Sequence, residues 1–171
     1  MPRVSTVEKE NAPEDVLRVY KQMESYFGRV SALPKVMAHN PAFLKSLFEL
    51  YGSIHSENDE LMQKIAVKVS KINSCKFCEG AHSYLLRKMG VSDEKIRSLE
   101  DDSQHSEKER AALRWAEVVT NKEYFGPDAD RSFEELKKQF DEKEIVNITA
   151  VIGMYNFLNR FVDSLGIDPE F

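Results

Sequence analysis

The chain has 171 residues and a formal net charge of −5 at pH 7, and 42% of its residues are hydrophobic. This length suits one domain with a substantial core, and the few glycines and prolines argue against a long disordered tract. Acidic and basic residues are interspersed without a basic run, so we do not expect nucleic-acid binding. No apolar stretch approaches the roughly 20 residues that span a bilayer, and a secretory apolar segment is missing, so we expect a cytoplasmic protein without membrane contact.

The first third of the chain is typical of two amphipathic helices. Residues 13–27 begin with a proline and repeat apolar side chains at helical spacing. Residues 41–54 follow Asn40 and also have proline at the first helical position. We assign residues 1–56 to an N-terminal helical extension packed on the core and residues 57–171 to that core, with one domain overall.

The helical period continues to the end of the chain. We predict further helices over residues 57–72, 75–89, 92–99, 106–121, 131–140 and 141–165. Ser106 and Glu109 have the spacing of a capping box, whereas residues 121–130 contain a Gly-Pro pair and are predicted to be a loop. The last helix is apolar on most faces, so we expect it to be the central buried helix. No alternating strand with a hairpin turn is present, and the predicted fold class is an all-α, single-domain helical bundle.

Cys75 and Cys78 are the only cysteines in the chain, and His82 follows four residues after the second. In the cytosol such a close pair is more often catalytic or metal-binding than a permanent disulfide. If Asn73 or Ser74 caps the helix, Cys75 lies in its first turn, and Cys78 and His82 share one face. The two cysteines are then close enough for a disulfide after modest adjustment.

This placement favours a reactive thiol. A helix N-terminus stabilises an anion by about 0.3–1 kcal/mol, or up to about 2 kcal/mol when partly buried. Since one pKa unit corresponds to about 1.4 kcal/mol, the helix dipole alone lowers a thiol pKa by roughly one unit. To ionise the thiol further near neutral pH, a base that accepts its proton is needed. We therefore hypothesise that Cys78 is the reactive thiol, His82 its base and Cys75 the resolving partner.

Three other interpretations of the cysteine pair stay open at this point. The two residues can be ordinary core cysteines. They can be half of a zinc site, but zinc needs two further ligands, and beyond His82 the other histidines show no ligand spacing. A thioredoxin-like motif needs a βαβ context, which the sequence lacks.

The pattern Gln63-x11-Cys75-x2-Cys78-x3-His82 resembles the signature of the alkylhydroperoxidase D (AhpD)-like branch of the carboxymuconolactone decarboxylase family. The likeness covers roughly residues 57–165. It implies an all-helical homo-oligomer that reduces hydroperoxides with the cysteine pair, which a dithiol protein reductant then restores. No metal, haem, flavin or other cofactor is implied.

The resemblance also implies a role for each residue of the pattern. Cys78 matches the cysteine that attacks the peroxide, Cys75 the one that closes the disulfide and meets the reductant, and His82 the relay histidine. The family has glutamate where this chain has Gln63, and glutamine can orient a histidine but cannot accept its proton. Glu60, one helical turn away, can substitute unless Arg87 pairs with it. We expect weakened peroxidase activity rather than none.

Two alternative functions follow from the same residues. The pair can act as a dithiol–disulfide redox sensor or binding module with little turnover, a role that Gln63 favours. A lactone enzyme of the carboxymuconolactone decarboxylase kind is the second alternative. Such enzymes usually lack paired thiols, so the cysteine pair argues against it.

Several other polar and aromatic residues have two interpretations. Asn156, Asn159, Arg160 and Asp163 form a polar stripe on the last helix. We favour an Arg160–Asp163 pair with two mutually bonded amides, or a subunit contact, over a pocket lining.

The aromatic residues and one histidine can likewise line a pocket or serve packing. Tyr51, Tyr84 and Tyr155 can edge a pocket, but helical aromatics usually serve packing, as we also expect of Trp115. His55 precedes the motif helix and can reach the site from outside it.

The departure at residue 63 generates a prediction. If the missing carboxylate limits proton transfer, Gln63→Glu raises the steady-state rate of hydroperoxide reduction relative to wild type. An unchanged rate would show that the departure is harmless or that the relay is wrong.

Overall fold

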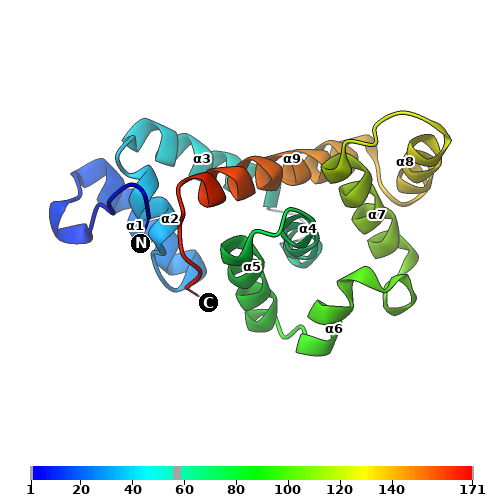
Figure 1. The fold of residues 1–171 in the computed structure, drawn as a ribbon, viewed down its shortest axis with the longest axis horizontal. Helices are drawn as coiled ribbons and strands as arrows, with labels where there is room; N and C mark the ends of the chain where they lie inside the picture. The colour runs from blue at the N-terminus through cyan, green and yellow to red at the C-terminus, as the bar shows by residue number, and fades with distance from the viewer. Residues whose placement is uncertain (1, 56–58, 171) are drawn as a thin grey trace.

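The computed structural model describes residues 2–55 and 59–170, and within these ranges its regular structure consists of helices without a strand (Figure 1). The α-helices are α1 (Glu14–Phe27), α2 (Ala32–Met37), α3 (Pro41–His55), α4 (Asp59–Ile72), α5 (Lys76–Lys88), α6 (Asp93–Arg97), α7 (Glu107–Asn121), α8 (Pro127–Gln139) and α9 (Glu142–Ser164). Short 3₁₀ turns are η1 (Lys9–Asn11), η2 (Ser98–Glu100) and η3 (Asp102–Gln104). The all-α prediction is confirmed.

Local capping explains where several helices begin. The Ser106 side chain accepts from the Glu109 backbone N–H, and Glu109 accepts from the Ser106 N–H, which is the predicted capping box of α7. Asn40 accepts from the Phe43 N–H at the start of α3. Ser92 caps α6 in the same way. These bonds satisfy backbone donors that a helix start would otherwise leave unpaired.

The central helix is α4, not α9 as the sequence predicted. All ten residues from 61 to 70 are buried, because α4 packs against α5, α7 and α9 together (Figure 1). The helix α9 runs along the length of the molecule and buries one side only. Val146, Gly153 and Phe157 on its other side are exposed. The composition of a helix gives its apolarity, but the number of neighbours decides how much of it is covered.

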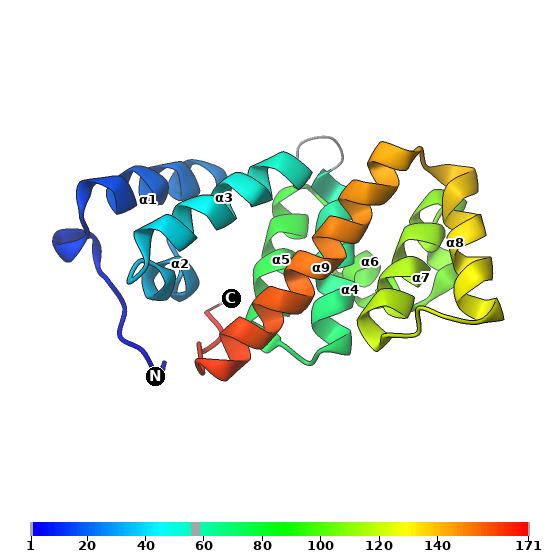
Figure 2. The same cartoon turned by 90° about the horizontal axis from the view of Figure 1, so that it is seen from above.

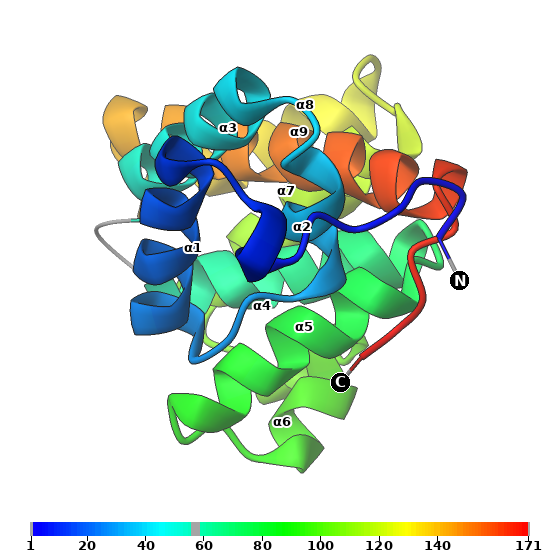
Figure 3. The same ribbon diagram turned by 90° about the vertical axis from the view of Figure 1, so that its left-hand side faces the viewer.

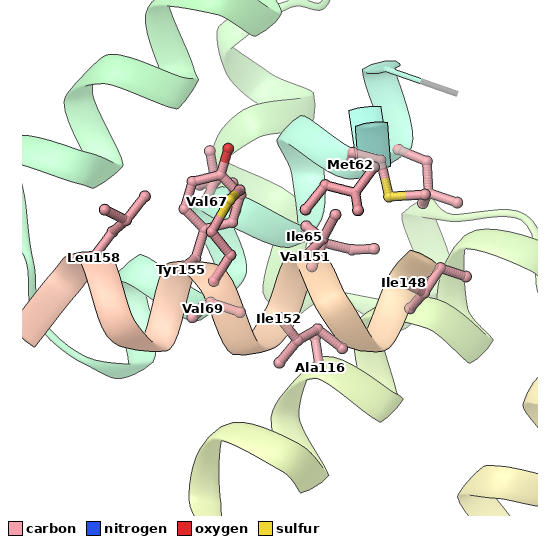
Figure 4. Packing of buried hydrophobic residues seen from close by; sticks show 14 of the residues in the cluster. Met62, Ile65, Val67, Val69, Ala116, Ile148, Val151, Ile152, Tyr155 and Leu158 are labelled. Carbon is pink, nitrogen blue, oxygen red and sulfur yellow. The ribbon is translucent and has the colours of Figure 1, made fainter. Parts of the chain in front are cut away.

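The core lies between α4, α7 and α9 (Figure 4). Its central members include Ile65 and Val69 of α4, Ala116 of α7, and Ile148 and Ile152 of α9, none of which is exposed to solvent. Among the described helices, α9 alone is long and apolar enough to cross a membrane, and a mostly apolar core helix passes the same test. Its buried residues account for part of that apolarity, and the exposed Val146 and Phe157 contribute to the rest.

The helices α1 to α3 pack on one end of the bundle, opposite α8 (Figures 1 and 2). The helix α3 contacts both α1 and α9, and buried residues of α1 and α3 join the same hydrophobic cluster as α4. The N-terminal segment runs beside the end of α9, where the Arg3 N–H donates to the Leu165 carbonyl (Figure 3). The division at residues 56 and 57 falls outside the described residues and stays a prediction.

Two helical segments differ from the sequence prediction. We did not predict α2, a six-residue helix that contains a proline and buries Val36 and Met37. The helix α8 begins at Pro127, inside the predicted loop, because proline is well suited to the first helical position. The sequence prediction took the Gly126-Pro127 pair as a helix breaker, whereas proline near a helix start is compatible with helix.

The packing of α9 generates a prediction. Ile152→Ala removes a fully buried side chain and should lower the free energy of unfolding by about 2–5 kcal/mol. Val146→Ala, on the exposed side of the same helix, should change it by less than about 0.5 kcal/mol. Urea unfolding followed by circular dichroism measures both, and equal losses would contradict the assignment of the buried side.

Candidate active site

The turn between α4 and α5 sets the position of the first cysteine. Ser74 has a φ of +60°, a left-handed conformation that is uncommon outside glycine, and its N–H donates to the Lys71 carbonyl. The Cys75 N–H then donates to the Ser70 carbonyl over 2.9 Å. Cys75 is itself the N-cap residue of α5, whereas we predicted Asn73 or Ser74 as the cap and Cys75 in the first turn. Cys78 lies in that first turn instead.

A partly buried group of amides holds this turn against α9. Asn73 donates to the side-chain oxygens of Asn156 and Asn159 over 3.0 and 2.9 Å, and Asn159 donates to the Ser70 hydroxyl over 3.1 Å. Asn159 has no solvent exposure, and its amide lies close enough to the Cys78 thiol to act on its pKa. The polar stripe of α9 thus reaches the cysteines, which the sequence interpretation did not favour.

The expected Arg160–Asp163 pair is not among the ion pairs of the described residues. Arg160 donates instead to the backbone and side-chain oxygens of Asn156, over 2.7 and 3.1 Å. The two amides of the stripe, Asn156 and Asn159, are bridged by Asn73 rather than bonded to each other. The residue that links them comes from another helix end, so α9 alone could not reveal it.

The two cysteines are free and buried, and their thiols lie close enough to influence each other's ionisation. Cys75 is fully buried and Cys78 is 3% exposed. The Cys75 thiol beside it, and then burial, raise the pKa of the Cys78 thiol above its usual value, and the Asn159 amide acts in the opposite direction. The dipole argument predicts the reverse shift, so within the resting pair Cys78 keeps its proton unless a base accepts it.

The helix α2 and the segment after α9 pack against the two thiols. Cys75 and Cys78 share a hydrophobic cluster with Val36 of α2, and with Ile167 in the segment after α9. We call residues 165–170 the C-terminal strap. Glu170 fixes it by accepting from the Arg29 guanidinium over 2.8 Å.

Two of the predicted site residues, His82 and Gln63, contact each other beside the cysteines. Their contact is 2.7 Å long and joins His82 Nδ1 to Gln63 Oε1. An amide oxygen can only accept, so His82 Nδ1 carries the proton and Nε2 is the basic nitrogen of the neutral ring. His82 is 9% exposed and Gln63 is fully buried.

Three further side chains complete this polar group, and none belongs to the cysteine motif. Gln63 Nε2 lies 2.9 Å from Tyr51 Oη and 3.4 Å from His55 Nδ1. Tyr155 Oη lies 3.0 Å from His55 Nε2, and its ring packs edge-on against His82 with centroids 4.4 Å apart. We call His82, Gln63 and His55 the His–Gln–His network.

The sequence held only a weak signal for this network. Tyr51 and His55 are four residues apart on α3, and their rings stack at 4.0 Å. We interpreted the tyrosines mainly as packing, whereas Tyr51 and Tyr155 hydrogen-bond within the network. Trp115 does pack, against Phe133, with its N–H on Thr149.

Neither Glu60 nor Arg87 behaves as the sequence suggested. Glu60 accepts from Lys64 over 2.6 Å, and Lys64 also donates to Glu109 over 2.6 Å. Arg87 pairs with Asp93. Burial acts to raise the pKa of Glu109, but Lys64 and the capping bonds bring it down to about 2. Glu60 is thus committed to a buried lysine and is not the substitute for the missing glutamate.

A cavity of about 130 Å³ opens beside Cys78 and His82. It lies between the N-terminal helices, α5 and α9, and most of its lining is apolar, as with Phe27, Leu44 and Leu158. Tyr51, Tyr84 and Tyr155 all line it, as does Arg29. The extension therefore supplies one wall of the pocket. Nowhere in the described part of the chain do three His, Cys, Asp or Glu side chains form a metal-binding group.

Comparison with known proteins bears on the family and the fold. Residues 41–118 match the model of the carboxymuconolactone decarboxylase family, from α3 into α7. Over these residues the chain is similar to this family, and its all-α fold is the one found in AhpD-like structures, as the sequence pattern predicted.

Individual relatives are distant in sequence. The uncharacterized protein YdfG of Bacillus subtilis (strain 168) is 28% identical over 124 residues, which cover 69% of this chain and 82% of YdfG.

Two crystal structures share the fold over nearly the whole chain. The debrominase Bmp8 (apo) has a TM-score of 0.85 at 24% identity, covering 98% of this chain and 91% of Bmp8. The AhpD core of an uncharacterized peroxidase-related protein from Ralstonia eutropha JMP134 has a TM-score of 0.85 at 20% identity, covering 99% and 92%.

The raised pKa of Cys78 generates a prediction for stability. Above about pH 8.5 the unfolded chain loses this proton while the native state keeps it, so the unfolded state binds fewer protons. The free energy of unfolding should therefore fall as pH rises, by up to about 1.4 kcal/mol per pH unit from this group.

Urea unfolding of the reduced protein between about pH 8 and 10 measures this slope. Cys78→Ser removes the titrating thiol and is the matched variant, so its slope should be shallower. Identical slopes in the two proteins would show that the native state does not hold the proton on Cys78.

Proposed function

We propose that this protein is a thiol-dependent peroxidase that reduces organic hydroperoxides through Cys78 and Cys75. The observation that carries the proposal is the pair of neighbouring thiols at the start of α5, where Cys78 lines an apolar cavity together with His82. The AhpD-like fold supports it, since the family includes enzymes.

The chemistry balances with these residues alone and one external reductant. His82 accepts the Cys78 proton, and the thiolate attacks the outer oxygen of the hydroperoxide, which yields a Cys78 sulfenic acid and an alcohol. His82 returns the proton to the departing alkoxide. Cys75 then condenses with the sulfenic acid, releasing water and forming the disulfide. A dithiol protein reductant restores both thiols by exchange.

The cavity suggests the kind of hydroperoxide. An apolar cavity of about 150 Å³ in another protein stays dry and binds benzene, and the volume here is similar. A hydroperoxide that carries one apolar ring or a short branched chain fits this space and gains from its burial. Hydrogen peroxide gains nothing from an apolar lining, so we propose that it is the poorer substrate.

The cell location and the assembly are parts of the same proposal. A cysteine pair that a dithiol reductant restores suits the cytoplasm, where thiols are kept reduced. The exposed side of α9 carries Val146 and Phe157 beside Gly153, which supports a homo-oligomer in which a second copy covers this side.

A second function is favoured by one comparison. Bmp8 was also crystallised as a cysteine-to-alanine variant in complex with 2,3,4-tribromopyrrole, and that structure has a TM-score of 0.86 to this chain. A brominated ring is apolar and fits the cavity described above. Reductive debromination also needs a dithiol: an aryl bromide and two thiols give the arene, a disulfide and hydrogen bromide. The third candidate, a dithiol–disulfide redox sensor, differs from both enzymes because its cysteine pair is oxidised with little catalytic turnover.

A peroxidase assay with dithiothreitol as the dithiol donor separates these functions. We expect continuous consumption of cumene hydroperoxide with a higher kcat/KM than for hydrogen peroxide. Both Cys78→Ser and Cys75→Ser should reduce turnover to background, whereas Lys76→Ala, at an exposed position of the same helix turn, should not.

Three outcomes contradict the proposal. Consumption that stops after one equivalent identifies a sensor. Bromide release from 2,3,4-tribromopyrrole without peroxide turnover identifies a dehalogenase. Full activity in Cys78→Ser excludes the thiol mechanism.

A further inference from the structure

The glutamine at residue 63 creates a problem that a glutamate would not have. Either oxygen of a carboxylate can accept the His82 proton, so its orientation is immaterial. An amide has one acceptor end and one donor end. If the Gln63 amide turned over, its NH₂ group would face His82 Nδ1, and the histidine would have to move its proton to Nε2. The ring would then lose its basic nitrogen at Nε2.

The structure contains a partner that can fix this orientation. The Gln63 nitrogen has two hydrogens, and it lies near two acceptors, Tyr51 Oη at 2.9 Å and His55 Nδ1 at 3.4 Å. A tyrosine hydroxyl both donates and accepts, so it fits either orientation of the amide. An imidazole nitrogen without a proton only accepts. With its proton on Nε2, His55 therefore fits only the orientation in which the amide nitrogen faces it, whereas Tyr51 fits both.

The position of His55 is itself well defined. It is 3% exposed, its ring stacks on Tyr51 at an interplanar angle of 11°, and its Nε2 lies 3.0 Å from Tyr155 Oη. With Nδ1 accepting from Gln63, the neutral ring must carry its proton on Nε2 and donate it to Tyr155. One amide orientation thus fixes the tautomers of two histidines on different helices, α3 and α5.

We propose that His55 is a positioning residue: it accepts from Gln63 Nε2, holds the amide oxygen toward His82, and so keeps Nε2 as the basic nitrogen of His82. His55 lies outside the cysteine motif and acts through Gln63 rather than on the thiols. Its role rests on the proposed function only in that His82 serves as the base for Cys78. This arrangement explains how the chain can use a neutral residue where the family has glutamate.

The resting protein provides the first test, without any substrate. Long-range ¹H–¹⁵N correlation spectra of protein labelled with ¹⁵N-histidine show which ring nitrogen carries the proton, at about pH 8, where unperturbed imidazoles are neutral. We expect the proton on Nδ1 of His82 and on Nε2 of His55. The reverse pair of tautomers overturns the proposal. The chain has four histidines, so single substitutions suffice to assign the signals.

Matched variants provide the second test. His55→Phe keeps a ring that can stack on Tyr51 but removes the acceptor, so His82 should populate the Nε2–H tautomer and Cys78 oxidation should slow by up to about 10²-fold. His55→Asn places an amide oxygen near the former Nδ1 and should retain the tautomer and most of the rate. Adding Gln63→Glu to His55→Phe should restore the Nδ1–H tautomer of His82 and the rate of Cys78 oxidation. Either oxygen of a carboxylate accepts the His82 proton, so no neighbour is needed to orient it.

The outcomes are distinct from those of the peroxidase proposal. A folded His55→Phe protein in which His82 keeps its Nδ1 proton shows that His55 does not set the orientation. If His55→Phe does not fold, the wild-type tautomers and the His82 tautomer in His55→Asn show whether His55 sets the orientation of the Gln63 amide. Absence of hydroperoxide turnover leaves the tautomer result intact, because the spectra are recorded without substrate.

Discussion

The close approach of two thiols at the start of α5 is the constraint on which the rest of the site depends. It exists because the chain turns sharply after α4, with Ser74 in a left-handed conformation, and because the Cys75 backbone returns to Ser70. Asn73 and Asn159 hold that turn against α9. The long helix therefore does more than fill the core: it supplies the amide that acts on the pKa of the Cys78 thiol.

The buried polar side chains next to the thiols and His82 include two neutral amides. Asn159 contacts one end of the site and Gln63 the other, and both are fully buried. A buried carboxylate without a cation costs several kcal/mol, whereas a hydrogen-bonded amide is tolerated much more readily. The corresponding disadvantage is that an amide has one acceptor end and one donor end, so its orientation must be fixed. At Asn159 the donors and acceptors are distributed over three neighbours, and at Gln63 a second histidine meets the same need.

Access to the site follows from its burial. The cavity gives a small apolar substrate a place beside Cys78, whereas Cys75 lies under Val36 and the C-terminal strap. The strap is held in this position by the Arg29–Glu170 ion pair and by the Ala32 N–H, which also donates to Glu170.

The sequence predicted the features that depend on neighbours along the chain. The capping box at Ser106, the Asn40 cap and the all-α class follow from local chemistry and helical period, and the structure confirms them. Contacts between distant segments could not be predicted in the same way. His55 is near the motif only because α3 packs beside α9 and the motif helices, and Asn73 bridges the two amides of α9 only because of the folded turn. The central place of α4 likewise depends on packing.

The central claim is that Cys75 and Cys78 form a redox pair, and the intact mass of the protein before and after one equivalent of cumene hydroperoxide tests it most directly. The wild-type protein should lose two hydrogens as an intramolecular disulfide forms, whereas Cys78→Ser should keep its mass. An unchanged wild-type mass, or a gain of oxygen atoms in place of the disulfide, would contradict the account.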